Sequence, residues 1–193
     1  MIHLVQGVLF LRYKWNTLGG IWGYSTTLLT YQRTIMESIQ NQIARVFSDP
    51  FEFIQRLQIV NKAGRVVPLE LNAEQIEIIN ALEQGRDTLV LKPRQIGSST
   101  VVCAYMFWKA YTSTTPLTLI ILSYKIASSK HLLHIHKRFY QYLPEGLKRE
   151  LEVDNTTELA FKGGGRIIAA AATQAGGLRS QTCSMLHLSL IHI

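Results

Sequence analysis

The sequence predicts an α/β protein with a parallel sheet and flanking helices. Between residues 88 and 142, short apolar runs alternate with segments of helical periodicity, which is the order of β-α-β units. The apolar runs are nearly continuous, as is typical of parallel strands covered on both faces. With 47% hydrophobic and 17% charged residues among 193, the composition is that of a globular protein with a sizeable core.

Residues 1–35 differ from the rest of the chain. They contain Arg12, Lys14 and Arg33 but no Asp or Glu, and they show no sustained helical or strand period. One interpretation is a basic arm that binds nucleic acid. The other, which we expect, is a non-native or disordered leader that precedes a true start at Met36.

A helical N-terminal segment is expected over residues 36–67. The stretch MESIQNQIARVF has apolar residues at helical spacing, and Asp49-Pro50 is expected to end this helix. The apolar positions are Ile39, Ile43, Val46 and Phe47. A short apolar segment, FEFIQRLQIV, then leads to a turn over residues 61–64.

The stretch LNAEQIEIINALEQGRD predicts the best-marked helix. Asn72 suits the N-cap position, Gln75 three residues later can complete a capping box, and Gly85 is expected to end the helix. The buried stripe is expected at Ile76, Ile79 and Leu82.

The elements that follow are predicted in the order strand, loop, helix, strand, helix. Their ranges are 88–91 for the first strand, 99–111 for the helix, 117–123 for the second strand and 127–142 for the second helix. A hairpin is expected next, with strands TELAF and RIIAAAA joined across residues 162–165, and CSMLHL indicates the beginning of another buried strand.

Charge and cysteine content suggest the class of partner and the compartment. The net charge of +7 and the isoelectric point near 9.5 favour an anionic partner such as nucleic acid or nucleotide. Two cysteines, Cys103 and Cys183, form no disulfide framework and suit a reducing cytoplasm. No apolar run reaches the ~18 residues of a membrane helix, so we expect a cytoplasmic protein without a membrane partner.

The stretch LVLKPRQIGSSTVV, residues 89–102, has the parts of a phosphate-binding loop. Gly97 gives the backbone freedom, Ser99 can offer a hydroxyl to Mg²⁺, and Thr100 flanks it at the start of a helix. The common pattern GxxxxGK[ST] is altered, because Ser98 stands where that pattern has Lys, and the cations are Lys92 and Arg94. The alternative is a structural strand-to-helix corner with two surface cations.

The segment LKPRQIGSST resembles the ATP-binding loop of the large subunit of tailed-phage terminases, the motors that package DNA into procapsids. That family tolerates a Walker A loop with the lysine at its first position. The resemblance implies a P-loop NTPase core over residues 68–187 that binds ATP and Mg²⁺. In it, Lys92 and Arg94 would contact the β- and γ-phosphates, and Ser99 would hold Mg²⁺. The implied ATP-binding set also includes Pro93, Gln95, Ile96, Gly97, Ser98 and Thr100.

Three further segments resemble the same family. LNAEQIEII resembles its adenine-recognition segment, in which Gln75 would bind the base; closing the capping box is an equally good physical role for Gln75. LTLIILSYKIASSKHLLHIHKRFYQYLP resembles the second strand and helix of the core. GGLRSQTCSMLHL resembles the approach to the Walker B strand and would bring Arg179 near the nucleotide, although Arg179 could equally be a solvated loop cation.

The chain departs from the family where hydrolysis needs carboxylates. Walker B chemistry requires an Asp for Mg²⁺ and an acid for the attacking water, yet no Asp or Glu follows Glu158. The last six residues, LSLIHI, resemble the translation of a sequencing adapter, so we expect residues 188–193 to be an artefact and assign no catalytic residue. A sheet cut at this strand would leave an exposed edge, and we expect weak ATP binding without useful hydrolysis.

The resemblance implies a function only for the full-length parent protein. That protein would couple ATP hydrolysis to DNA translocation in the cytoplasm of an infected host cell. Its partners would be double-stranded DNA, the portal protein ring and a small terminase subunit. Two alternatives are a helicase-like P-loop ATPase, and a nucleotide- or DNA-binding fragment without turnover.

A group of basic residues lies on the helix predicted over residues 127–142. His131, His134 and His136 have no Cys or acid at ligand spacing, so solvated side chains are a better interpretation than a metal site. The nearby cations are Lys130, Lys137 and Arg138. They could form a DNA-facing patch or an ordinary solvated surface.

Overall fold

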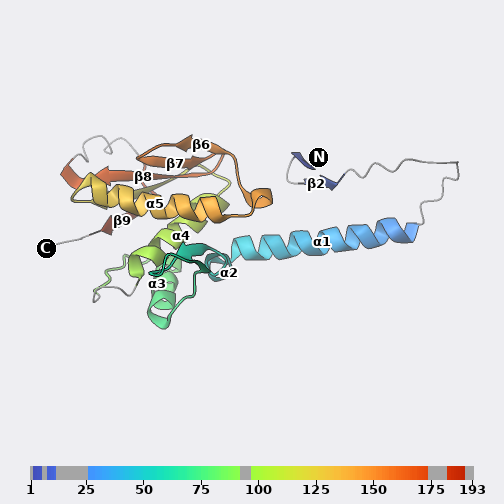
Figure 1. The fold of residues 1–193 in the computed structure, drawn as a ribbon, viewed down its shortest axis with the longest axis horizontal. Helices are drawn as coiled ribbons and strands as arrows, with labels where there is room; N and C mark the ends of the chain where they lie inside the picture. Colours follow the sequence, from blue (N-terminus) through green and yellow to red (C-terminus); the bar gives the residue numbers. More distant parts are fainter. Residues whose placement is uncertain (1, 6–7, 12–25, 92–96, 174–181, 190–193) are drawn as a thin grey trace. The chain divides into compact units, whose positions relative to one another are not determined.

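The fold was analysed in a computed structural model, which describes residues 2–5, 8–11, 26–91, 97–173 and 182–189 (Figure 1). The chain is α/β and divides into two units, Met1–Asn41 and Gln42–Ile193. Lys92, Pro93, Arg94, Gln95, Ile96 and Arg179, all predicted to bind ATP, lie outside the described residues.

The N-terminal unit contains a strand pair and the first part of a long helix. β1 (Ile2–Val5) pairs antiparallel with β2 (Val8–Leu11), and α1 (Thr26–Ser48) begins well before Met36. The helix therefore runs through the boundary predicted at residue 36. The sequence TTLLTYQRTI hid this start because its threonines have low helix propensity and interrupt the apolar period. That residues 1–35 are a leader stays a prediction.

The C-terminal end of α1 packs against the core of the second unit. Val46 and Phe47 are partly buried there, whereas Ile39 and Ile43 are 44% and 37% exposed. Trp108 donates from its indole nitrogen to the carbonyl oxygen of Phe47 at 2.9 Å. Of the apolar residues predicted for this helix, only Val46 and Phe47, in its last turns, are therefore packed against the core.

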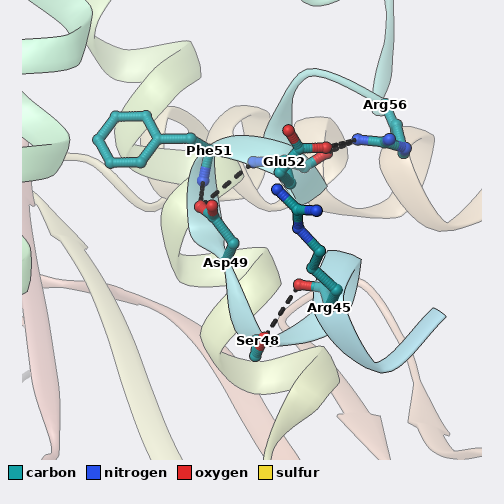
Figure 2. Close-up of polar contacts among 6 residues, drawn as sticks. All are labelled: Arg45, Ser48, Asp49, Phe51, Glu52 and Arg56. Carbon is teal, nitrogen blue, oxygen red and sulfur yellow. Dashed lines mark hydrogen bonds and ion pairs between the residues drawn. The ribbon is translucent and has the colours of Figure 1, made fainter. Parts of the chain in front are cut away.

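Asp49-Pro50 ends α1, as predicted, and also begins a second helix, α2 (Pro50–Ile54), which was not predicted. The Asp49 carboxylate accepts hydrogen bonds from the backbone N–H groups of Phe51 (2.8 Å) and Glu52 (3.4 Å), as Figure 2 shows. Proline at the first helical position needs no N–H partner. Asp49-Pro50 therefore ends α1 and also caps the N-terminus of α2.

Two further contacts in Figure 2 stabilise this junction locally. The Ser48 hydroxyl donates to the carbonyl oxygen of Arg45 at 2.9 Å, and Arg56 pairs with the Glu52 carboxylate at 2.6 Å, one helical turn apart. Both contacts are exposed, so each contributes little to the free energy of unfolding.

The apolar segment after α2 forms a hairpin. β3 (Gln58–Val60) pairs antiparallel with β4 (Val66–Pro68) across the turn predicted at residues 61–64. The Asn61 side chain organises this turn, since its oxygen accepts from the N–H groups of Ala63 and Arg65, both at 3.0 Å.

α3 (Ala73–Glu83) confirms the predicted helix and its capping. At its C-terminus, Gly85 donates to the Leu82 carbonyl and Arg86 to the Ala81 carbonyl, which is the Schellman pattern. The predicted stripe is wrong in one position, because Ile76 is 37% exposed. The buried residues are Gln75, Ile78 and Ile79.

The strand predicted over residues 88–91 is not formed. Residues 86–91 have no regular structure, and Leu89 and Leu91 are 77% and 90% exposed, while Val90 packs against the core. A strand needs a hydrogen-bonded neighbour, and no described strand pairs with this segment. The strand prediction is wrong because it rested on apolar content alone.

The second unit is built on a mixed five-stranded sheet in the order β6-β7-β8-β5-β9. β5 (Leu117–Ser123) pairs in parallel with β8 (Gly165–Ala171) and with β9 (Met185–Ser189). β6 (Leu151–Asp154) and β7 (Glu158–Phe161) extend the sheet antiparallel. The parallel sheet is confirmed for β8, β5 and β9, and the predicted hairpin is confirmed as β7 and β8, whose tight turn gives antiparallel pairing.

Two helices pack on the same face of this sheet. α4 (Ser98–Thr112) and α5 (Ile126–Tyr142) confirm the predicted helices, and the short 3-10 helix η1 (Glu145–Leu147) follows α5. The Phe161 ring of β7 contacts Tyr111 of α4, with ring centroids 5.4 Å apart, and Tyr140 of α5 at 6.0 Å. One side chain meets both helices, so both lie on one face of the sheet, whereas the apolar runs predicted a sheet covered on both faces.

Gly165 explains how closely α4 approaches the sheet. A β-carbon at Gly165 would lie 2.6 Å from the Cα atom of Ala110, which is far inside van der Waals contact. Around this contact the core is rich in aromatic rings from several elements. They are Phe53, Phe107, Tyr111, Phe139 and Phe161.

β9 carries apolar side chains that the described part of the chain leaves open. Leu186 and Leu188 are 52% and 50% exposed and alternate with the more buried Met185, His187 and Ser189. β9 is also the last strand in the described sheet. Among the described residues, this face of β9 is therefore apolar and open to solvent.

Candidate functional site

The candidate site lies where two helices begin, the N-termini of α3 and α4. The predicted ATP-binding residues that the structure describes are Gln75, Gly97, Ser98, Ser99 and Thr100. It brings Gln75 of α3 against Gly97, which immediately precedes α4. Ser98, Ser99 and Thr100 form the first turn of α4.

Gly97 is the N-cap of α4 and has a left-handed backbone, with φ of +75°. L-residues with a side chain rarely adopt this conformation, whereas glycine does so without strain. As N-cap, glycine also provides no side-chain oxygen for the N–H groups of the first turn. The start of α4 therefore combines a left-handed residue with backbone donors that the side chain of the N-cap residue does not satisfy.

The charge pattern of α4 favours an anion at this end. Its first turn contains no acidic residue, and its last turn contains Lys109. The macrodipole places partial positive charge at the N-terminus, where N–H groups point outward, and such termini bind phosphates. Chemically, this end of the helix can hold a phosphate group.

Gln75 is buried, and its amide has a defined orientation. Its Oε1 accepts from the N–H of Asn72 at 3.2 Å, and Asn72 Oδ1 accepts from the N–H of Gln75 at 2.8 Å. A β-carbon at Gly97 would lie 2.8 Å from Gln75 Nε2. The capping-box role of Gln75 is confirmed, and the same amide faces the proposed loop.

Two residues that the sequence did not indicate hold α3 and α4 together. The hydroxyl of Tyr105 in α4 donates to the Glu83 carboxylate of α3 at 2.7 Å. Burial, followed by this hydrogen bond and the charge of Glu83, raises the pKa of Tyr105. They are positioning residues, and no local signal could reveal a contact between positions so far apart in sequence.

The three histidines of α5 differ in burial. His131 and His134 are exposed, as predicted, but His136 is fully buried. Burial lowers the pKa of His136 to about 4; the Leu132 carbonyl, 2.9 Å from Nδ1, opposes this shift, and the charge of His187 adds to it. Its solvated interpretation is wrong because the helix turns residue 136 toward the sheet.

Cys103, one of the two cysteines, lies in the core within α4, as predicted. It is fully buried, and burial raises the pKa of its thiol. In the part of the chain that the structure describes, no three His, Cys, Asp or Glu side chains are grouped as metal ligands. No helix in the same residues is both long and apolar enough to cross a bilayer.

Comparisons with known proteins add no identification. No protein-family model matches the chain, and no curated protein is similar to it.

Proposed function

We propose that this chain is the ATP-binding part of a terminase large subunit, with a P-loop core. The observation that supports it most is the left-handed Gly97 at the start of α4, with the Gln75 amide beside it. This geometry falls within the segment LKPRQIGSST, the sequence that resembles the terminase loop.

The described residues fit a nucleoside triphosphate with Mg²⁺. The first-turn N–H groups of Ser98, Ser99 and Thr100 would donate to phosphate oxygens, and the Ser99 hydroxyl would hold Mg²⁺. When bound, Mg²⁺ would neutralise part of the negative charge of the phosphates. Gln75 would bind the adenine while its Oε1 keeps the capping box, since a carbonyl oxygen has two lone pairs.

The remaining contacts of the proposal lie outside the described residues. Lys92 and Arg94 would meet the β- and γ-phosphates from the front of the loop, and Pro93, Gln95 and Ile96 would complete the cradle. Arg179 would approach from the segment before β9. Long cationic side chains suit this task because charge-assisted hydrogen bonds to phosphate are the strong ones.

In the full-length protein, this site would drive translocation of double-stranded DNA through a portal ring. A small terminase subunit would be a further partner, in the cytoplasm of an infected host cell. Binding without turnover is the second candidate for these 193 residues, since no Asp or Glu follows Glu158. A helicase-like ATPase would share the same loop, and nuclease carboxylates in the parent protein would distinguish the terminase.

The test of this proposal is the affinity for Mg·ATP of the Lys92→Ala variant. We expect Kd to rise about 10-fold to 100-fold, because a charge-assisted contact contributes roughly 1.5–3 kcal/mol. Isothermal titration calorimetry with and without Mg²⁺ measures it. Ser99→Ala should weaken binding only when Mg²⁺ is present.

Lys162→Ala is the matched control, since Lys162 is exposed and pairs with Glu150 at 2.9 Å on the sheet. It should bind Mg·ATP like the unaltered chain. Equal affinity of Lys92→Ala and the unaltered chain would contradict the assigned cation. Absence of Mg·ATP binding by the folded, unaltered chain would contradict the nucleotide site as a whole.

A further inference from the structure

The outward face of α5 carries positive charge along its length. Its exposed residues recur at intervals of three and four, which places them along one side of the helix. They are Ala127, Lys130, His131, His134 and Gln141, with the half-buried Arg138 in the same row. We call Lys130, His131, His134 and Arg138 the basic face of α5.

The basic face contains no compensating acid. No Asp or Glu occurs anywhere in α5, from Ile126 to Tyr142. Among the described residues, neither Lys130 nor Arg138 forms an ion pair. Many other cations of the second unit do pair with a carboxylate. They are Arg56, Lys137, Lys148, Lys162 and Arg166.

The contrast with Lys137 is informative because this residue neighbours Arg138 on the same helix. Lys137 is turned toward the sheet and pairs with Asp154 at the end of β6. Its charge is therefore neutralised within the protein. Arg138 is half-buried and has no ion pair among the described residues, so its charge remains available to a partner.

The chemistry of the basic face fits a polyanion better than a protein surface. Protein interfaces depend on large apolar or aromatic anchors, and the exposed row on α5 has none. Contacts to a nucleic acid backbone use Lys, Arg and polar side chains without such anchors. Lys130 and Arg138 are about 12 Å apart along the helix axis, with both histidines between them, so the row can follow successive phosphates.

We propose that the basic face of α5 binds the phosphate backbone of double-stranded DNA, without base specificity. The choice of DNA as the polyanion rests on the proposed function, whereas the cationic surface is independent of the nucleotide loop. The contact is electrostatic, so its affinity falls as salt rises and counterions compete.

The experiment measures binding of a fluorescent DNA duplex by anisotropy, from about 50 to about 200 mM salt. The variant carries Lys130→Gln and Arg138→Gln together. We expect its affinity at low salt to fall at least about tenfold, and the slope of log affinity against log salt to decrease by roughly 2. A duplex of different sequence should give the same result.

The matched control carries Arg45→Gln and Arg86→Gln, which remove the same charge from exposed sites elsewhere. It should retain most of the affinity and slope, and both variants should keep the unfolding midpoint of the unaltered chain. The proposal is overturned if the unaltered chain does not bind DNA, if the α5 variant binds as well as it does, or if the control loses as much.

The two proposals can fail separately. The α5 variant should bind Mg·ATP with unchanged affinity, because none of its altered residues belongs to the loop. The Lys92→Ala variant should keep most of its DNA affinity. If the unaltered chain binds DNA but not Mg·ATP, the nucleotide site is contradicted and the basic face is not.

Discussion

Gly97 and Gln75 show how single residues shape the candidate site. The left-handed backbone at Gly97 turns the chain into α4, and the missing side chain leaves room for the Gln75 amide. Gln75 is held in place by the capping box with Asn72. The capping box therefore holds Gln75 at the start of α3 in the position where it contacts Gly97 at the start of α4.

Replacing Gly97 with alanine should destabilise the protein by about 1–2 kcal/mol. The new methyl group would be held in the left-handed region and would lie 2.8 Å from Gln75 Nε2. Urea unfolding measures the free-energy change. Gly146→Ala is the control, because a β-carbon there meets nothing within 4 Å and φ is not positive. Equal stability of the two variants would contradict this account of Gly97.

At the scale of elements, one arginine links α4 to the antiparallel part of the sheet. The Arg149 guanidinium donates to the carbonyl oxygens at the C-terminal end of α4, Tyr111 and Ser113, the latter at 2.8 Å. It also donates to the Lys162 carbonyl in the turn between β7 and β8, at 3.1 Å. The terminal carbonyls of the helix are thereby satisfied from a distant segment.

Arg149→Met should cost about 2 kcal/mol of unfolding free energy, because it keeps the apolar stem and removes the donors to these carbonyls. Guanidinium unfolding followed by circular dichroism measures the loss. Arg86→Met, at an exposed position after α3, should change stability by less than about 0.5 kcal/mol. A loss at Arg86 as large as that at Arg149 would show that the bonds from Arg149 are not the cause.

For the molecule as a whole, His136 couples stability to pH. It is buried between α5 and the sheet, and its folded-state pKa of about 4 lies below its ordinary value of 6.5. Between these values the unfolded chain binds the proton and the folded chain does not. Its contribution is fully present above pH 6.5 and is lost as pH falls toward 4.

The His136→Gln variant should therefore lose less stability than the unaltered chain on acidification. From about pH 7.5 to about pH 5, the difference between the two losses should be about 2 kcal/mol. Urea unfolding at both pH values measures it. His134→Gln, on the exposed side of α5, should retain the full pH dependence. If His136→Gln also retains the full pH dependence of stability, a group other than His136 is responsible for it.

The sequence predicted several elements because their signals are local. The N-cap at Asn72, the apolar run over Leu117–Ser123 and the long helix that ends at Tyr142 were all identified, and β5 has the predicted bounds. Capping and periodicity act within a few residues, so they can be recognised without the fold. Part of the candidate site, Gln75 as a cap and Ser99 and Thr100 at a helix start, was predictable for the same reason.

Strand pairing, and which side chains of a helix are buried, could not be predicted in this way. Thr88–Leu91 has a strand-like composition but no partner, Ile76 lies on a helical stripe but points outward, and His136 is turned inward. The placement of both helices on one face shows in contacts such as those of the Phe161 ring with Tyr111 and Tyr140, which lie far apart in the sequence. Each of these outcomes depends on residues far away in the chain.

By itself, the sequence determined where α3 begins and ends, where the turn at residues 61–64 falls and which segment resembles an ATP-binding loop. Only the tertiary structure decided that Gln75 faces Gly97, that Lys137 is paired while Arg138 is not, and which histidine is buried. The physical reason is range: caps and periods act between near neighbours, whereas burial and ion pairing depend on which distant segments fold against each other.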